Sequence, residues 1–499
     1  MNPNAVKQLV ILVLCGIVAV LFGSILASGS YDDLLLLSYL LVGVYTLAAP
    51  GFAPLIAFGI LNPFILPIPF VRGVPFILLI LAICCVKLFF RNALTREGRA
   101  EYQHCFTWGI VLVFGWVALR YCMHPVFPNL SGFGANVTGF RAYLDYGICF
   151  ALVVLLPFFF TTRDDVIRLL RWMGGISVFF ILLFIPLVFS RRMLAALWLQ
   201  RFGLFVTTFD NGWLRFVVLP GFGLNLLMLS FFPRLAPVPR WLRLTMGALG
   251  LVAIVMGGNR TSVLMGFVMV VAVLLVRRRI ATLSLLVVGT ALLLVAFHFI
   301  GERLDVRRGV GFWRIMSVTS RRIAEQTDAA GNAEWRMIRW KRALDEIQTN
   351  PLFGKGYGGV ENAWLFTDWA GFEDASLEVG LAAGGIHNGF LNGAYSLGIP
   401  AVLFFLVTFL AQSIMSFKKA RRLGGGDPVL SDVHAFVFAN LAGLPVAIYL
   451  GNDLNNSMIW FFLVLGVRLT RLKANESTAG ESPSPKPIEM PFLPGRMTA

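Results

Sequence analysis

Charge is the scarcest property of this chain. Of its 499 residues, 14% are charged, whereas 58% are hydrophobic and 13% are aromatic. A soluble domain carries roughly 25% charged residues, so the composition excludes a soluble protein of this length. Apolar runs of about 18 or more residues predict membrane-spanning helices. The sequence therefore predicts an all-α, polytopic membrane helix bundle.

About fourteen such runs are present, which gives an expectation of 12–14 transmembrane helices. They lie near 9–27, 33–49, 51–70, 74–90, 105–122, 142–160, 172–190, 214–232, 241–257, 261–276, 280–299, 386–415, 433–450 and 454–470. Five prolines between 50 and 69 can break the 33–70 region into re-entrant pieces. No small-residue cleavage site follows the first run, so it is predicted to be a retained anchor.

Metal-ligand and cofactor patterns are also missing. The six cysteines lie in or at the ends of apolar runs, without metal-type spacing. The acidic residues of the long polar segment 301–385 show no paired DxD-like spacing. We therefore expect no metal and no cofactor. The net charge of +16 comes from short loops, as the positive-inside rule describes, so it predicts topology and not a nucleic-acid partner.

The basic residues cluster in six places: 87–99, 163–171, 234–243, 277–279, 418–422 and 468–473. An even number of predicted spans separates each consecutive pair, so all six can share the cytoplasmic face. This places both termini in the cytoplasm and the large loop 301–385 outside it. Four regions follow: N-terminal spans at 1–240, a core at 241–415 that includes the loop, C-terminal spans at 416–473, and a disordered cytoplasmic tail at 474–499.

Some arginines remain in loops that this topology turns outward. Arg191, Arg192 and Arg201 share one loop, Arg215 lies at the outer end of its span, and Arg260 occupies the short turn GGNRTS. Charge kept at the bilayer edge is a functional-site hypothesis by default. The alternative is that these side chains reach lipid phosphates.

The polar segment 301–385 is long enough to fold. Apolar residues recur at helical spacing at Met337, Trp340, Leu344 and Ile347, which predicts an amphipathic helix of about four turns. Asn350-Pro351 ends it. The glycine-rich run LFGKGYGG follows and can bring backbone N–H groups close to an anion, but it lacks the Lys-Ser/Thr ending of a nucleotide P-loop.

His387 lies where the chain re-enters the membrane, and it is followed by Asn388 and Gly389. A histidine there can titrate near neutral pH and act as a general base. The structural alternative is that it caps the start of the next helix.

Three blocks, taken in order, resemble the O-antigen ligase and O-antigen polymerase superfamily. The first is Gly258-Asn259-Arg260-Thr261-Ser262. The second runs from Arg336 through Trp340, Ala343 and Leu344 to Pro351-Leu352-Phe353-Gly354-Lys355-Gly356. The third is His387-Asn388-Gly389-Phe390-Leu391, followed by Ser396-Leu397-Gly398-Ile399-Pro400. The likeness covers about 245–415. Many members of this superfamily have a serine where this chain has Asn259.

The resemblance implies a C-type glycosyltransferase fold and a metal-independent glycosyltransferase. Its donor would be a glycan on undecaprenyl pyrophosphate. Its acceptor would be a hydroxyl of lipid A-core or of a growing polysaccharide. The two substrates would bind among the membrane lipids on the outer side of the inner membrane. Arg260 and His387 would be catalytic. Arg215, Arg260, Arg336 and Asn388 would bind pyrophosphate or glycan.

Several functions remain open at this point. A ligase joins a finished polymer to lipid A-core. A polymerase of the same superfamily joins repeat units for O-antigen, capsule or exopolysaccharide, and a third kind of member transfers oligosaccharide to protein hydroxyls. A lipid-linked oligosaccharide flippase also has twelve to fourteen spans, but flippases place charge inside the bundle, and the predicted spans are nearly free of it.

Overall fold

The structure is a computed structural model of the chain. It describes residues 31–61, 65–68, 71–94, 105–126, 139–189, 207–210, 213–216, 218–301, 303, 315, 317, 319–326, 329–357, 381, 386–451 and 453–472. Several predictions fall outside these residues: the first span at 9–27, the arginines Arg191, Arg192 and Arg201, and the tail from 474.

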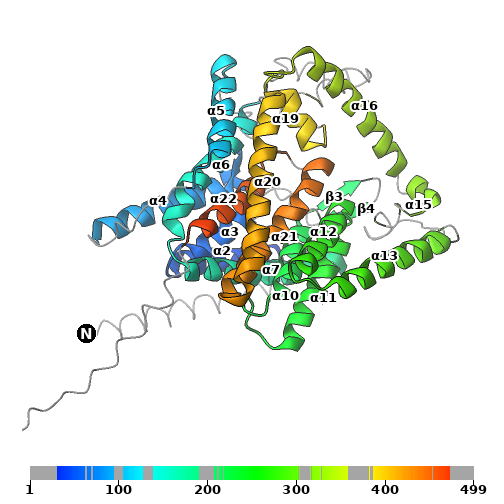
Figure 1. Cartoon of the computed structure of the whole chain (residues 1–499), viewed down its shortest axis with the longest axis horizontal. Coiled ribbons are helices and arrows are strands. Elements are labelled where there is room, and N and C mark those ends of the chain that lie inside the picture. The colour runs from blue at the N-terminus through cyan, green and yellow to red at the C-terminus, as the bar shows by residue number, and fades with distance from the viewer. Residues whose placement is uncertain are drawn as a thin grey trace, which may run out of the picture.

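The described chain is helical (Figure 1). Its N-terminal helices are α2 (Tyr31–Ala48), α3 (Ala53–Leu61), α4 (Phe76–Leu94), α5 (Trp108–Met123), α6 (Phe140–Phe159), α7 (Arg163–Phe189), α10 (Leu219–Ser230) and α11 (Arg240–Met256). The later ones are α12 (Arg260–Val276), α13 (Ile280–Gly301), α15 (Arg321–Gln326), α16 (Ala329–Thr349), α19 (Gly389–Leu397), α20 (Ile399–Arg422), α21 (Pro428–Leu450) and α22 (Ser457–Arg471). A short 3-10 helix, η3 (Leu423–Gly425), links α20 to α21.

Two antiparallel hairpins interrupt the helices. β1 (Ile65–Ile68) pairs with β2 (Val71–Pro75), and β3 (Thr207–Asp210) pairs with β4 (Trp213–Phe216). The prediction of a helical bundle is confirmed, and the hairpins are additions to it. The first hairpin replaces the second half of the span expected at 51–70, as the prolines of that region allow.

Five described helices are long and apolar enough to cross a membrane: Phe140–Phe159, Arg163–Phe184, Ile280–Ile300, Ile399–Gly425 and Pro428–Leu450. Four shorter apolar helices accompany them: Phe76–Phe89, Trp108–Met123, Leu219–Ser230 and Arg260–Val276. The protein is thus a polytopic helical membrane protein. In Figure 1, α13 extends away from the other helices, and none of its apolar window is buried.

Helix α21 lies at the centre of the bundle, in contact with α12, α20 and α22. Fully buried aromatic residues fill the interior there, among them Trp460, Phe405 and Phe436. Helices α10 and α11 approach most closely at Gly223 and Gly250, where a Cβ on either glycine would collide with the carbonyl oxygen of the other. Small residues at such crossings are typical of helix packing in membranes.

Contacts between basic residues and distant segments tie together one end of the bundle. Arg163 pairs with Asp427 at 2.7 Å, and Arg234 and Arg277 both pair with Asp432 at 3.3 Å. The Lys419 ammonium donates to the Thr470 carbonyl at 2.8 Å. Residues from five of the six predicted basic clusters therefore meet at one end of the molecule, which we call the basic end.

The span expected at 386–415 is not one helix. Helix α19 ends at Leu397, and α20 begins at Ile399. Gly398 between them has φ +90°, and a Cβ there would overlap the Leu352 carbonyl oxygen. A residue with a side chain cannot take this position without strain, so the chain turns here, and the apolar run alone does not reveal the turn.

Candidate functional site

Arg260 is the first residue of α12, at the helix end opposite to Arg277. Asn259 is the N-cap, and its side chain accepts a hydrogen bond from the Thr261 N–H at 3.0 Å. The preceding Gly258 has φ +63°. No acidic residue occupies the first turn of α12. A cation at the positive end of a helix dipole is stabilised by a nearby anion, and Arg260 is half-buried at this position.

Asn388 is the N-cap of α19, where the sequence left His387 as a possible cap. The Asn388 Oδ1 accepts hydrogen bonds from the N–H groups of Phe390 and Leu391, at 3.1 and 3.2 Å. This buried side chain thus fixes the start of the helix. His387 precedes it with φ +55°, a conformation that a non-glycine residue adopts at a cost.

Helix α16 packs against the His387 segment. The Trp340 indole N–H donates to the Ile386 carbonyl at 2.8 Å, and its ring lies 5.5 Å from that of Tyr449 at the end of α21. The Trp335 ring lies 6.3 Å from the His387 ring. The buried Arg339 guanidinium stacks on the Trp335 ring, 3.2 Å from its centroid. Arginine, tryptophan and histidine therefore form one assembly.

Burial and two neighbouring cations lower the pKa of His387. Reduced solvation at the junction lowers the pKa of its imidazole, and the Arg336 and Arg339 guanidiniums lower this pKa further. Burial lowers the pKa of Arg339 to about 10, so this arginine stays protonated at neutral pH. The neutral form of His387, which is the form that accepts a proton, is favoured near two fixed positive charges.

In the described part of the glycine-rich run, three consecutive backbone amides from Gly354 to Gly356 already donate to carbonyls of the protein. The N–H groups of Lys355 and Gly356 donate to the carbonyls of Tyr395 and Ser396, at 2.7 and 2.8 Å. The Lys355 ammonium pairs with Glu346 at 2.8 Å. The loop instead joins α16 to the turn between α19 and α20. Arg120 of α5 fixes it further, by donating to the Gly354 carbonyl at 3.0 Å.

Arg260 and His387 share one end of the bundle. α12 packs along α21, and Trp340 and Ile386 meet α21 at Tyr449, near its last residue, Leu450. This end is opposite to the basic end, and we call it the site end.

Residues 245–406 match the family model of the O-antigen ligases. The resemblance seen in the sequence is thereby confirmed. The matched region holds Arg260, Arg336, His387 and Asn388, and it is similar to the O-antigen ligase family. Among curated proteins, none matches the chain.

The matched region brings three of the predicted site residues together: Arg336, His387 and Asn388. Arg215 lies outside the match. Its backbone is in β4, opposite Thr208, and not in the helix that begins at Leu219. The position of its side chain is not described. Glu361 and Glu378, two acidic residues of the polar segment 301–385 that could act as the base instead of His387, lie outside the described residues. No group of three or more metal-ligating side chains occurs in the described part of the chain.

Two residues at the site end are not among those predicted from the sequence. Arg339 follows Arg336 by three residues, which places both on one helix face, and that spacing was the available signal. Asp453 lies between α21 and α22 and accepts a hydrogen bond from the Asn392 side chain at 2.7 Å. Burial raises the pKa of Asp453 to about 6. Nothing in the local sequence distinguishes this carboxylate from a solvated one.

Proposed function

We propose that this protein transfers a glycan from undecaprenyl pyrophosphate to an acceptor hydroxyl on the outer side of the inner membrane, with lipid A-core as the acceptor. The observation that supports this most is the His387 assembly. A histidine held in a strained backbone, with its pKa lowered by burial and by Arg336 and Arg339, suits a general base beside an anionic substrate.

The chemistry divides between two residues. The acceptor oxygen forms a bond to the anomeric carbon of the donor sugar, while the bond from that carbon to the pyrophosphate oxygen breaks. His387 takes the acceptor proton. The departing pyrophosphate gains negative charge, and Arg260 stabilises it with a fixed, bidentate guanidinium. Arg336 contributes positive charge on the glycan side, and we assign donor binding to Arg215 as well.

Substitution of Arg260 tests this assignment. Arg260→Ala should abolish glycan transfer while leaving the amount of protein in the membrane unchanged. Arg260→Lys should also transfer poorly, because lysine cannot form the bidentate fork. The matched control is Arg240→Ala, an exposed arginine at the opposite end of the adjacent helix α11, and it should keep full transfer. Normal product from the Arg260→Ala variant would remove Arg260 from the mechanism.

Deletion in the native host separates the possible acceptors. Loss of a ligase should leave long glycan chains stranded on the lipid carrier. Single repeat units on the carrier would identify a polymerase instead, and loss of glycan from proteins would identify a protein O-oligosaccharyltransferase. A purified enzyme should also consume a lipid-pyrophosphate glycan in detergent. Activity confined to sealed vesicles would indicate a flippase.

A further inference from the structure

Trp335 is an exposed tryptophan that is nevertheless held in place. Its side chain is 42% exposed, and Figure 1 shows its helix, α16, at the edge of the molecule between α19 and α15. The buried Arg339 guanidinium stacks on the ring, 3.2 Å from its centroid. Residues four apart on a helix are neighbours, so α16 itself supplies this contact. A large aromatic ring is thereby fixed in one orientation at the surface.

The face of α16 that carries Trp335 is polar. Trp335 shares this face with Arg342 and Glu346, which follow it by seven and eleven residues. The Arg342 guanidinium pairs with Glu346 at 3.5 Å, and the Lys355 ammonium pairs with Glu346 at 2.8 Å. A helix that lies in the membrane interface presents tryptophan on its apolar face instead. Trp335 is therefore not placed as a membrane anchor.

The Trp335 ring adjoins the proposed base. Its centroid lies 6.3 Å from that of the His387 ring, and the two planes are tilted by 45°. Trp340 of the same helix is used differently: its N–H donates to the Ile386 carbonyl, and its ring contacts Tyr449. Within the described residues, the indole N–H of Trp335 forms no hydrogen bond. An exposed ring and a donor N–H are thus available beside His387.

A pyranose ring fits this combination of groups. One face of a sugar ring presents C–H groups with a small positive charge, and the face of an indole is negative. The hydroxyls at the edge of the sugar require hydrogen-bond partners, and the Trp335 N–H and the His387 imidazole supply them. The two rings are close enough to contact the same sugar residue. A sugar stacked on Trp335 would therefore present a hydroxyl to His387.

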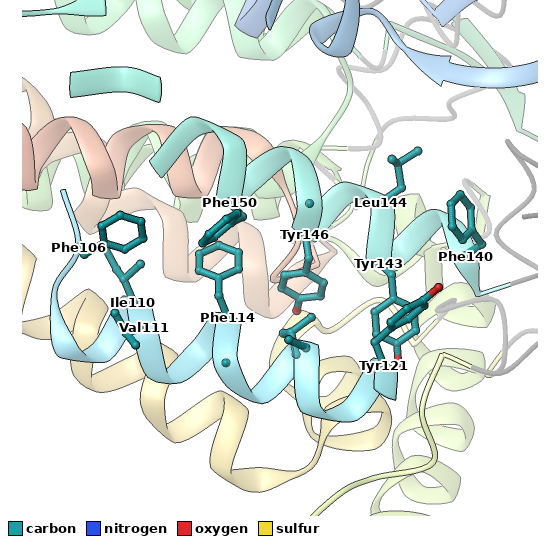
Figure 2. A pocket seen from close by; sticks show the side chains of 14 residues that line it. Phe106, Ile110, Val111, Phe114, Tyr121, Phe140, Tyr143, Leu144, Tyr146 and Phe150 are labelled. Atoms are coloured by element: carbon teal, nitrogen blue, oxygen red, sulfur yellow. The ribbon is translucent and has the colours of Figure 1, made fainter. Parts of the chain in front are cut away.

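The largest described hollow is less suited to a sugar. It lies between α5 and α6, has a volume of about 720 Å³, and is lined by rings such as Phe114, Tyr146 and Phe150 (Figure 2). No charged side chain belongs to its described lining, and neither does His387. A sugar bound there would lack both strong hydrogen-bond partners and the proposed base.

From this arrangement we infer that Trp335 is the platform on which the acceptor sugar stacks, with the attacking hydroxyl directed at His387. The inference rests on the proposed function for the reaction. It adds a specificity-determining residue, and it makes the acceptor a pyranose. The hydroxyl of a serine or threonine side chain carries no ring that could stack in this way.

Kinetics on purified full-length protein separate stacking from structural support. Trp335→Ala should raise the acceptor KM about tenfold and leave the donor KM unchanged, and Trp335→Phe should recover most of the loss because it keeps a ring. The matched control is Met337→Ala, an exposed apolar residue of the same helix that points to a different side. It should behave as the wild type.

The pH profile provides the contrary outcome. Arg336 and Arg339 remain in Trp335→Ala, so the acidic limb of its rate profile should stay in place. A lower kcat with a displaced limb and an unchanged acceptor KM would show that the ring only supports Arg339 and His387. That result would overturn the inference.

Binding can also be measured without transfer. The probes are two lipid-free oligosaccharides from the native host: the lipopolysaccharide core and the repeat unit of its surface polysaccharide. Saturation-transfer NMR should show contact between the protein and the C–H protons of at least one of them, lost in Trp335→Ala and kept in Met337→Ala. Equal signals in the two variants, or no signal from either probe, would overturn the inference.

Arg260→Ala distinguishes this inference from the proposed function. It should lose transfer and keep the oligosaccharide signals, because the phosphate-binding arginine is not part of the platform. Transfer that survives in Arg260→Ala, with signals that still require Trp335, would count against the proposed mechanism and not against the platform. Loss of transfer in Arg260→Ala, with signals that do not require Trp335, would count against the platform alone.

Discussion

At the scale of single residues, His387 combines backbone strain with a controlled charge. Its φ of +55° is maintained because the chain is fixed on both sides: Trp340 binds the Ile386 carbonyl, and Asn388 caps two amides of α19. Such conformations cost about 1–3 kcal/mol and persist where the surroundings determine them. The contacts of the neighbouring residues, and not the intrinsic backbone preference of histidine, therefore determine the position of His387.

The pH dependence of transfer follows from this charge environment. The pKa of His387 is lowered below its ordinary value of 6.5, so the neutral base persists as the pH falls through 6.5. The acidic limb of the rate profile should therefore lie below pH 6.5. Removing a neighbouring cation should raise the pKa of His387, so Arg336→Gln and Arg339→Gln should each move this limb to higher pH.

Lys341→Gln provides the control for that measurement. It removes a positive charge from the same helix, at an exposed residue that does not shift the pKa of His387. Its profile should match that of the wild type. If the limb stays in place in both arginine variants, then the titrating group is not His387, and Asp453 becomes the first alternative.

At the scale of elements, the two site helices each begin with an asparagine cap. Many members of the O-antigen ligase and polymerase superfamily, which this chain resembles, have serine where this chain has Asn259. Asparagine and serine are both good N-caps. Asparagine at this position can therefore cap α12 as serine would, and the structure shows Asn259 as the N-cap of α12. The cap fixes where α12 starts, and thereby where Arg260 points.

Substitution at Asn259 should follow capping strength. Asn259→Ala should lower the free energy of unfolding by about 1 kcal/mol, whereas Asn259→Ser should leave it nearly unchanged and should keep transfer. Thermal unfolding in detergent and the transfer assay measure the two effects. An alanine variant as stable as the serine variant would show that the observed hydrogen bond to the Thr261 N–H contributes nothing to α12.

The turn between α19 and α20 depends on Gly398. Gly398→Ala adds a Cβ where φ is +90° and where the Leu352 carbonyl would collide with it. For a residue other than glycine, this positive-φ conformation alone costs about 1–3 kcal/mol, and displacing the loop of Leu352 adds to this. Gly425→Ala is the control, since its Cβ would meet nothing within 4 Å. The Gly398→Ala variant should unfold at a lower temperature than the Gly425→Ala variant. Equal melting temperatures would contradict the requirement for glycine in the turn between α19 and α20.

The sequence predicted those elements whose signals are local. Asn350-Pro351 marks the end of α16 at Thr349, and the GGNRTS turn marks the start of α12. The break at Gly398 was missed because apolar residues flank it on both sides. Arg339 and Asp453 were missed because their importance comes from burial against distant segments, which hydropathy does not encode. The side-by-side placement of Arg336 and His387 likewise depends on how α16 packs.

At the scale of the whole molecule, the bundle has two chemically different ends. The basic end joins segments near 163, 234, 277, 419 and 468. The site end holds Arg260 and the His387 assembly. The parity of the predicted spans required the basic clusters to share a face, and the contacts at the basic end agree with that requirement. By the positive-inside rule, this end should face the cytoplasm.

Reporter fusions test that orientation. A fusion at Gly331 in α16 should report an extracytoplasmic location, and a fusion at Ala499 a cytoplasmic one. A third fusion at Gly425, in the turn η3 at the basic end, should give the same signal as the one at Ala499. The three together separate two kinds of error. Like signals at Gly331 and Gly425 would contradict the two-ended architecture itself, because α20 lies between the two ends. A cytoplasmic signal at Gly331 with extracytoplasmic signals at Gly425 and Ala499 would be consistent with the two-ended architecture. It would, however, place Arg260 and His387 on the cytoplasmic side, from which an acceptor on the outer side could not be reached.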